Sequence, residues 1–64
     1  MKFTVGDKVF IRELAQGSGI IKTCFLGARG WEYEVRYFND GKAELTYFFE
    51  DELEKRNEDE NPSR

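Results

Sequence analysis

The sequence is poor in the residue types that build catalytic and metal sites. Its 64 residues contain no histidine, one cysteine and one proline. A chain without histidine and with Cys24 as its single thiol has no Cys/His ligand set for zinc and no internal disulfide. A nucleophile paired with a general base is equally hard to assemble. We therefore expect a protein that is not an enzyme and that uses no cofactor and no metal.

Long apolar runs are also missing. No stretch approaches the roughly 20 apolar residues that cross a bilayer as a helix. The first ten residues, MKFTVGDKVF, lack the apolar segment of a signal peptide and already include Gly6 and Asp7. A lone cysteine fits a reducing compartment. The sequence thus predicts an unprocessed cytoplasmic protein without membrane contact.

Charge is unevenly distributed along the chain. Residues 1–49 carry seven Lys/Arg against six Asp/Glu, a net charge of +1, whereas residues 50–64 carry seven acids against three basic residues, a net charge of -4. Residues 57–64 contain no apolar side chain to offset the entropy of ordering. We expect one domain over residues 1–56, followed by a disordered acidic tail at 57–64.

Aromatic residues, in contrast, are abundant. The chain has ten of them, and a domain of this size buries only about 60% of the surface of its unfolded form. Aromatic rings must therefore carry the core, yet ten exceed what a small interior holds. We expect exposed rings among Phe10, Phe25, Trp31, Phe38, Tyr47 and Phe49. Trp31 and Phe38 are the strongest candidates because each stands where a strand leaves the core.

Alternation of apolar and polar residues predicts the first two strands. Residues 8–12 place Val9 and Ile11 on one face and Phe10 on the other. Residues 20–26 alternate poorly, which is typical of a bulged strand that changes faces. Ile21 and Cys24 are the expected inward pair.

The remaining strands surround an Asn39-Asp40-Gly41 hairpin turn. Residues 31–38 alternate cleanly, whereas residues 42–48 are apolar on both faces, so parity does not decide which side is buried. Residues 50–52 predict a single helical turn before a short fifth strand from Leu53. A longer helix over residues 50–56 is disfavoured because Leu53 is its only apolar residue.

Four short motifs together suggest a fold family. They are Val5-Gly6-Asp7-x-Val9-x-Ile11, Gly19-x-Ile21, Tyr33-x-Val35-x-Tyr37 before an Asp-Gly turn, and Phe48-x-Glu50-Asp51-x-Leu53. Over residues 3–56 this pattern resembles the SH3-like barrel group, most closely Tudor-like and KOW-like domains and short uncharacterised bacterial or phage proteins. The resemblance implies an all-β, five-stranded SH3-like (Tudor-like) barrel with a short helical turn before the last strand.

Tudor domains that read methylated lysine or arginine surround the cation with aromatic rings. Tyr37 matches one position of that cage. The other two positions fall near Ala43 and residues 12–14, where no aromatic residue stands. This departure disfavours methylated-residue reading.

Two other functions remain open. The KOW-like resemblance implies nucleic-acid binding, for which basic residues beside exposed aromatics would form a platform. The near-neutral body and the acids Glu32 and Glu34 disfavour phosphate binding. We therefore favour a protein-interaction module, with a protein partner or self-association, and docking on a larger enzyme as a variant. The candidate binding residues are Phe10, Trp31, Arg36, Tyr37, Phe38, Tyr47 and Phe49.

Overall fold

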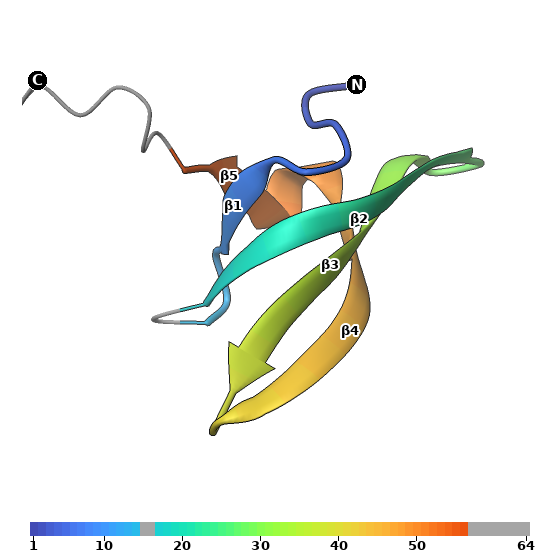
Figure 1. Cartoon of the computed structure of the whole chain (residues 1–64). Coiled ribbons are helices and arrows are strands. Elements are labelled where there is room, and N and C mark those ends of the chain that lie inside the picture. The colour runs from blue at the N-terminus through green and yellow to red at the C-terminus, as the bar shows by residue number, and fades with distance from the viewer. Residues whose placement is uncertain (15–16, 57–64) are drawn as a thin grey trace, which may run out of the picture.

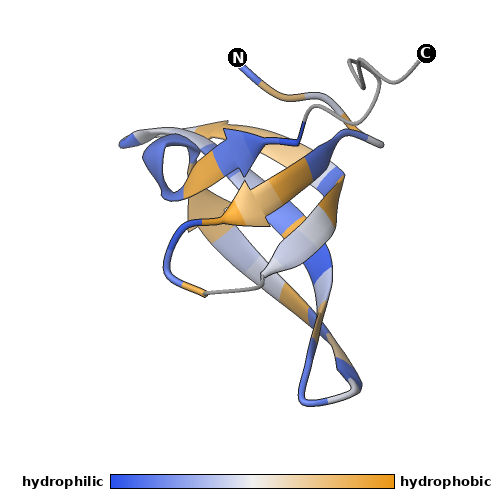
Figure 2. Cartoon of the chain, turned by 90° about the vertical axis from the view of Figure 1, so that its left-hand side faces the viewer, coloured by the Kyte–Doolittle hydropathy of each residue, from blue (hydrophilic) through white to orange (hydrophobic). Residues whose placement is uncertain are grey.

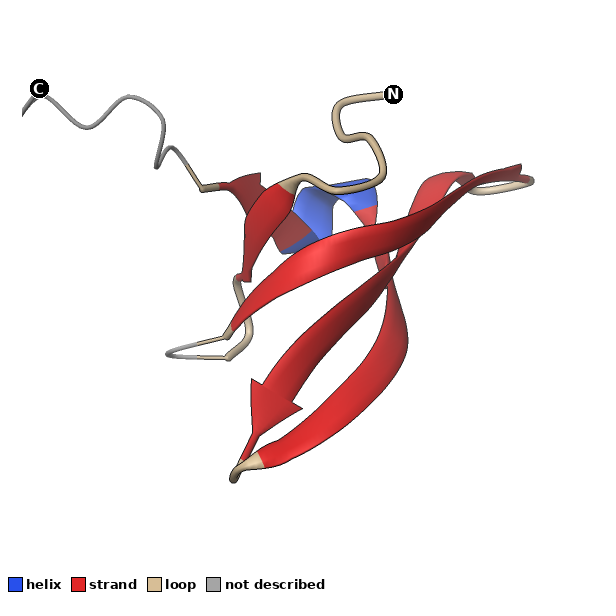
Figure 3. Ribbon diagram, in the orientation of Figure 1, coloured by secondary structure: helices blue, strands red, loops and turns tan. Residues whose placement is uncertain are grey.

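The computed structural model describes residues 1–14 and 17–56; the tail predicted at 57–64 lies outside the described residues. Five antiparallel strands and one 3-10 turn make up the fold (Figures 1 and 3). In chain order they are β1 (Lys8–Ile11), β2 (Ser18–Gly27), β3 (Gly30–Asn39), β4 (Lys42–Phe49), η1 (Glu50–Glu52) and β5 (Leu53–Lys55). The all-β class and the single helical turn are confirmed. A helix over residues 50–56 does not form.

All five strands belong to one curved sheet with the order β4-β3-β2-β1-β5. Strands β2, β3 and β4 form a meander. Strand β1 pairs with β2 at the edge of the meander opposite β4, and β5 lies beside β1 (Figure 1). Within residues 1–14 and 17–56, β4 and β5 each have a neighbour on one side only, so the sheet does not close and the closed barrel expected from the sequence is wrong. Closure would need the free edge of β5 to pair with β4, and β5 has only three residues.

The predicted bulge lies in the middle of β2. The register with β3 shifts between Ile21, which pairs with Val35, and Thr23, which pairs with Glu34. The extra residue lets Ile21 and Cys24, three positions apart, face the same side. Ile21 is fully buried and Cys24 packs against the core while half-buried. The inward pair expected from the sequence is therefore confirmed.

The core is small and lies on the concave side of the sheet. Its seven buried hydrophobic residues are Phe3, Val9, Ile11, Ile21, Tyr33, Val35 and Leu53. Hydrophobic and hydrophilic bands alternate along the strands, as a sheet with one buried face requires (Figure 2). Tyr33 is the largest fully buried side chain, and its ring meets Phe3 edge to face at a centroid distance of 5.2 Å.

The β3–β4 hairpin decides the orientation of β4. Asp40 and Gly41 at its turn have φ angles of 53° and 78°, which are the left-handed values that a tight hairpin needs. The resulting register pairs Phe48 with the buried Tyr33 and Leu45 with the exposed Arg36. Phe48 therefore faces the core, and Leu45 faces away from it.

Candidate binding surface on the outer face of the sheet

The side of the β2–β4 meander that points away from the core forms a continuous surface, here called the outer face. Each strand contributes four side chains, and none of them is buried. They are Ser18, Ile20, Thr23 and Phe25 from β2, Glu32, Glu34, Arg36 and Phe38 from β3, and Ala43, Leu45, Tyr47 and Phe49 from β4. Lys8 and Phe10 of β1 continue the same face.

The outer face is unusually apolar for a solvent-facing surface. Nine large apolar side chains are exposed in the described part of the chain. Six of them belong to the outer face, namely Phe10, Ile20, Phe25, Phe38, Leu45 and Tyr47. Single exposed apolar residues are common, but a cluster of this kind marks an interaction site.

Charge divides this face into two ends. Cross-strand pairing places its residues in four rows. From the β3–β4 turn to the β2–β3 turn, these rows are Phe10, Ser18, Phe38 and Ala43; then Lys8, Ile20, Arg36 and Leu45; then Thr23, Glu34 and Tyr47; then Phe25, Glu32 and Phe49. The first row is uncharged, although Glu54 of β5 pairs with its Phe10. The second row carries two cations. The third and fourth rows carry one carboxylate each. The face therefore has a basic end toward the β3–β4 turn and an acidic end toward the β2–β3 turn.

A groove of about 220 Å³ runs over the basic end. Its lining residues are Lys8, Ser18, Gly19, Ile20, Lys22, Arg36, Tyr37, Phe38 and Arg56, and none of these is acidic. The Arg36 guanidinium lies 6.0 Å from the centroid of the Phe38 ring, close enough for a cation–π contact. The groove thus combines four cations with an exposed aromatic ring.

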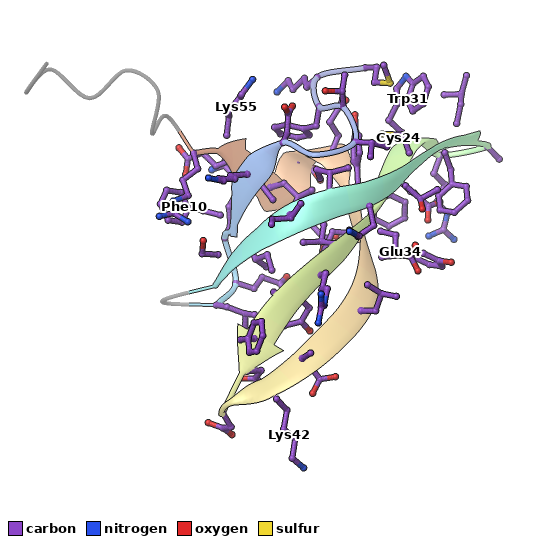
Figure 4. The ribbon with its side chains drawn as sticks, in the orientation of Figure 1. Phe10, Cys24, Trp31, Glu34, Lys42 and Lys55 are labelled. Carbon is purple, nitrogen blue, oxygen red and sulfur yellow. The ribbon has the colours of Figure 1, made fainter. Side chains whose placement is uncertain are left out.

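Arg56 ties the groove to β1. Its guanidinium donates a hydrogen bond to Ser18 Oγ at 2.6 Å and lies 5.6 Å from the centroid of the Phe10 ring. Phe10, on β1 (Figure 4), therefore borders the groove without lining it.

The acidic end consists of the half-buried carboxylates of Glu32 and Glu34 and of the aromatic rings beside them. Thr23 Oγ1 donates a hydrogen bond of 3.0 Å to Glu34. The Phe25 and Tyr47 rings meet edge to face at 5.2 Å. The hydroxyl of Thr23 orients the carboxylate of Glu34 (labelled in Figure 4), and Tyr47 pairs with Glu34 on the neighbouring strand.

A second hollow, of about 270 Å³, lies away from the groove. It is lined by Lys2, Arg29, Gly30, Trp31, Phe49, Glu50 and Asp51. Trp31 is half-buried and stacks on Tyr33 at a centroid distance of 6.4 Å. The mixed charges of this hollow give it no preference for an anionic or a cationic ligand.

The predicted binding residues thus fall in three places. Arg36, Tyr37 and Phe38 line the groove, and Phe10 borders it. Tyr47 and Phe49 stand at the acidic end, and Phe49 also lines the second hollow together with Trp31. Tyr37 is only partly available, because its ring packs on Phe48 at 5.9 Å and its hydroxyl shares a hydrogen bond with Thr46.

Sequence reasoning missed Ile20, Leu45 and Arg56 as members of this surface. Ile20 and Leu45 face each other across β3, each paired with Arg36. Ile20 directly precedes the inward Ile21, so alternation was an available signal that it points outward. For Leu45 the signal was its alternation with Ala43 and Tyr47, and the register of β4 decides which side these residues face.

The thiol of Cys24 is poorly suited to nucleophilic chemistry. It donates a weak hydrogen bond to the Phe3 carbonyl oxygen at 3.7 Å. Burial, with a smaller contribution from the negative charge of Asp7, raises the pKa of the thiol. The reactive thiolate is therefore disfavoured at neutral pH.

Glu50 fixes the N-terminal segment onto the core. Its carboxylate accepts a hydrogen bond from the Tyr33 hydroxyl at 2.5 Å and another from the Lys2 backbone N–H at 2.8 Å. These donors, Tyr33 first, lower the pKa of Glu50 below its ordinary value. These hydrogen bonds of Glu50 with Tyr33 and Lys2, here called the polar junction, close the core on the side where Phe3 packs.

Because the polar junction lowers the pKa of Glu50, we expect the folded protein to lose stability in acid. A carboxyl group whose pKa is lower in the folded state stabilises the fold above its unfolded pKa, about 4.3 for glutamate. That contribution disappears as the pH falls through the folded-state pKa. We expect the free energy of unfolding to fall between about pH 5 and about pH 3 more steeply in the wild type than in Glu50→Gln. Urea denaturation at both pH values measures this difference, and equal slopes would contradict it.

No helix in residues 1–14 and 17–56 has the length and apolar character needed to cross a membrane. Comparison of the chain with protein-family models, with curated proteins and with solved structures gives no match.

Proposed function

We propose that this protein is a non-enzymatic interaction module that docks a protein partner through the outer face of its sheet. The observation that carries this proposal is the gathering of six exposed large apolar side chains on that one face. Protein interfaces typically join an aromatic centre to a polar rim. Here Phe38, Leu45 and Tyr47 are all more than half exposed, and charged side chains lie beside them.

The fold that we propose for the module is the SH3-like one. Two features support it. The strand order places β5 beside β1 and β1 beside β2, and the 3-10 turn η1 directly precedes β5. The second agrees with the short helical turn before the last strand that the sequence resemblance implies. Such a scaffold leaves function to its surface.

The test of docking is a matched pair of substitutions. Phe38 and Val5 are each 64% exposed, but only Phe38 belongs to the outer face. We expect Phe38→Ser to lose most of the partner captured by the tagged wild-type protein from extracts of its native host, because an interface aromatic is removed. Val5→Ser should retain it. Quantitative mass spectrometry of the captured proteins measures both.

Stability distinguishes docking from folding in the same experiment. Removing a side chain that is mostly in solvent should change the free energy of unfolding by no more than about 0.5 kcal/mol. Phe38→Ser should therefore keep the wild-type urea midpoint. Equal capture by Phe38→Ser and the wild type would overturn docking through the outer face. Unfolding of Phe38→Ser would show that Phe38 contributes to the core.

The basic groove favours a second function, the binding of single-stranded nucleic acid. Four cations beside an aromatic ring form the combination that contacts phosphates and stacks on bases. The net charge of the chain, -3, does not reveal this local concentration of positive charge. The outer face, however, continues from the groove to Glu34 and Glu32, so a strand leaving the groove in that direction would meet carboxylates. For this reason protein docking remains the primary proposal.

A further inference from the structure

We propose that the partner of the outer face is a second copy of this chain, packed face to face about a two-fold axis. This inference rests on the proposed docking function and names its partner. Two sheets commonly pack by their faces with strands nearly aligned, and a two-fold interface uses the same surface of both copies. The outer face is suited to this arrangement because its two ends are complementary in charge and in side-chain size.

Charge complementarity is centred on β3. Arg36 and Glu34 stand two positions apart on this strand and both belong to the outer face. A two-fold axis that runs across the strands between them brings Arg36 opposite Glu34 of the partner subunit. Symmetry then repeats this contact, so one axis forms two ion pairs. Lys22, at the bulge beside these rows, adds a further cation to the basic side.

Side-chain sizes can also be compared between the positions that this two-fold axis brings together. On the basic side, the row beyond Arg36 contains the small residues Ala43 and Ser18. On the acidic side, the row beyond Glu34 contains the large rings of Phe49 and Phe25. The axis places Ala43 opposite Phe49 of the partner subunit, so a small side chain meets a large one, which is the condition for close packing. The same axis places Ser18, which accepts the hydrogen bond of Arg56, opposite Phe25 of the partner subunit. On β3 it places Phe38 opposite Glu32 of the partner subunit.

An apolar pair lies between these contacts on β4. Leu45 is 56% exposed and Tyr47 is 55% exposed, and the axis brings each of them opposite the other residue of the partner subunit. Their burial would supply the hydrophobic gain, and the Arg36–Glu34 pairs would fix the orientation of the two copies. The arrangement also covers Phe38, the most exposed aromatic residue of the outer face.

The experiment is sedimentation velocity of the full chain, from roughly 10 μM to 1 mM, at about 0.1 M and about 0.5 M salt. The variants are Arg36→Glu, Glu34→Arg, and the double variant that carries both. The control is Lys42→Glu. Lys42 is exposed at the β3–β4 turn and points away from the sheet (Figure 4). Lys42→Glu reverses a positive charge as Arg36→Glu does, but at a position outside the proposed contact.

The wild type and Lys42→Glu should dimerise with equal constants that weaken at high salt. Each single reversal places like charges in contact twice, and we expect it to weaken dimerisation by about tenfold or more. The double variant restores the ion pairs with exchanged signs and should recover dimerisation. A mixture of Arg36→Glu and Glu34→Arg should also form a heterodimer, since their charges are complementary in both contacts.

Two outcomes would overturn the inference. One is a monomer at every concentration, and the other is a dimer that neither single reversal weakens. The docking function has its own readout, because a host partner lost from Phe38→Ser would sustain that function even if the chain is monomeric. Single-stranded DNA added to the same sedimentation runs provides a further contrast. A monomer that binds it through the groove, with loss of binding in Arg36→Glu, would replace self-association by the nucleic-acid function.

Discussion

Replacing Tyr33 by alanine should leave most of the chain unfolded. Tyr33 is the largest fully buried side chain and contacts the rings of both Phe3 and Trp31. Truncating a buried aromatic residue to alanine typically costs about 3–5 kcal/mol. A domain of this length has a total stability of roughly 3–10 kcal/mol, so the loss is comparable to the whole. Far-ultraviolet circular dichroism and urea denaturation measure the outcome.

The control for this prediction is Tyr33→Phe. It keeps the ring and its packing but removes the hydroxyl that donates to Glu50 and accepts a hydrogen bond from the Lys2 backbone N–H at 3.2 Å. We expect a folded protein of reduced stability. If Tyr33→Phe unfolds as completely as Tyr33→Ala, the polar junction rather than ring packing dominates the contribution of Tyr33.

Gly19→Ala should destabilise the fold by about 1–3 kcal/mol, the usual cost of overpacking a tight interior. A Cβ atom at Gly19 would lie 2.5 Å from Val35 Cγ1 and 2.7 Å from the backbone carbonyl oxygen of Arg36. The second contact involves backbone of the neighbouring strand, so relief requires β2 and β3 to separate. Urea denaturation followed by Trp31 fluorescence measures the change in unfolding free energy.

Gly27→Ala is the matched control in the same strand. Its nearest heavy atom, Glu32 Oε2, would be 3.5 Å from the new Cβ, which is an ordinary contact. We expect the unfolding free energy to change by no more than about 0.5 kcal/mol. Equal losses in the two glycine variants would indicate that strand propensity, and not the close approach of β2 to β3, determines the cost.

Local patterns in the sequence were sufficient for most of the fold. The broken alternation after Ile21 predicts the β2 bulge, and Asn39-Asp40-Gly41 predicts the hairpin turn. Such features depend on neighbouring residues only. The failure of the sheet to close was not predictable in this way, because it depends on whether the free edge of β5 pairs with β4, which no local pattern determines.

The binding surface was harder to predict because it depends on registers between strands. The near-neutral sum over residues 1–49 disfavoured phosphate binding in the sequence analysis. The pairing of Ile20 with Arg36, and of Thr23 with Glu34, instead sorts the charges into two ends of one face. Arg56 joins the basic end only because β5 brings it beside β1, since its backbone N–H bonds the Lys8 carbonyl oxygen.

The pairing of β1 with β5 also has a consequence for the order of folding. Strands β2, β3 and β4 follow one another along the chain and are joined by short turns, so they meet at a small cost in loop-closure entropy. Val9 and Lys55, which pair in the same sheet, stand near opposite ends of the described chain. Non-local contacts of this kind form late. The meander, with the outer face on it, is therefore expected to nucleate folding, and the joining of β1 to β5 to complete it.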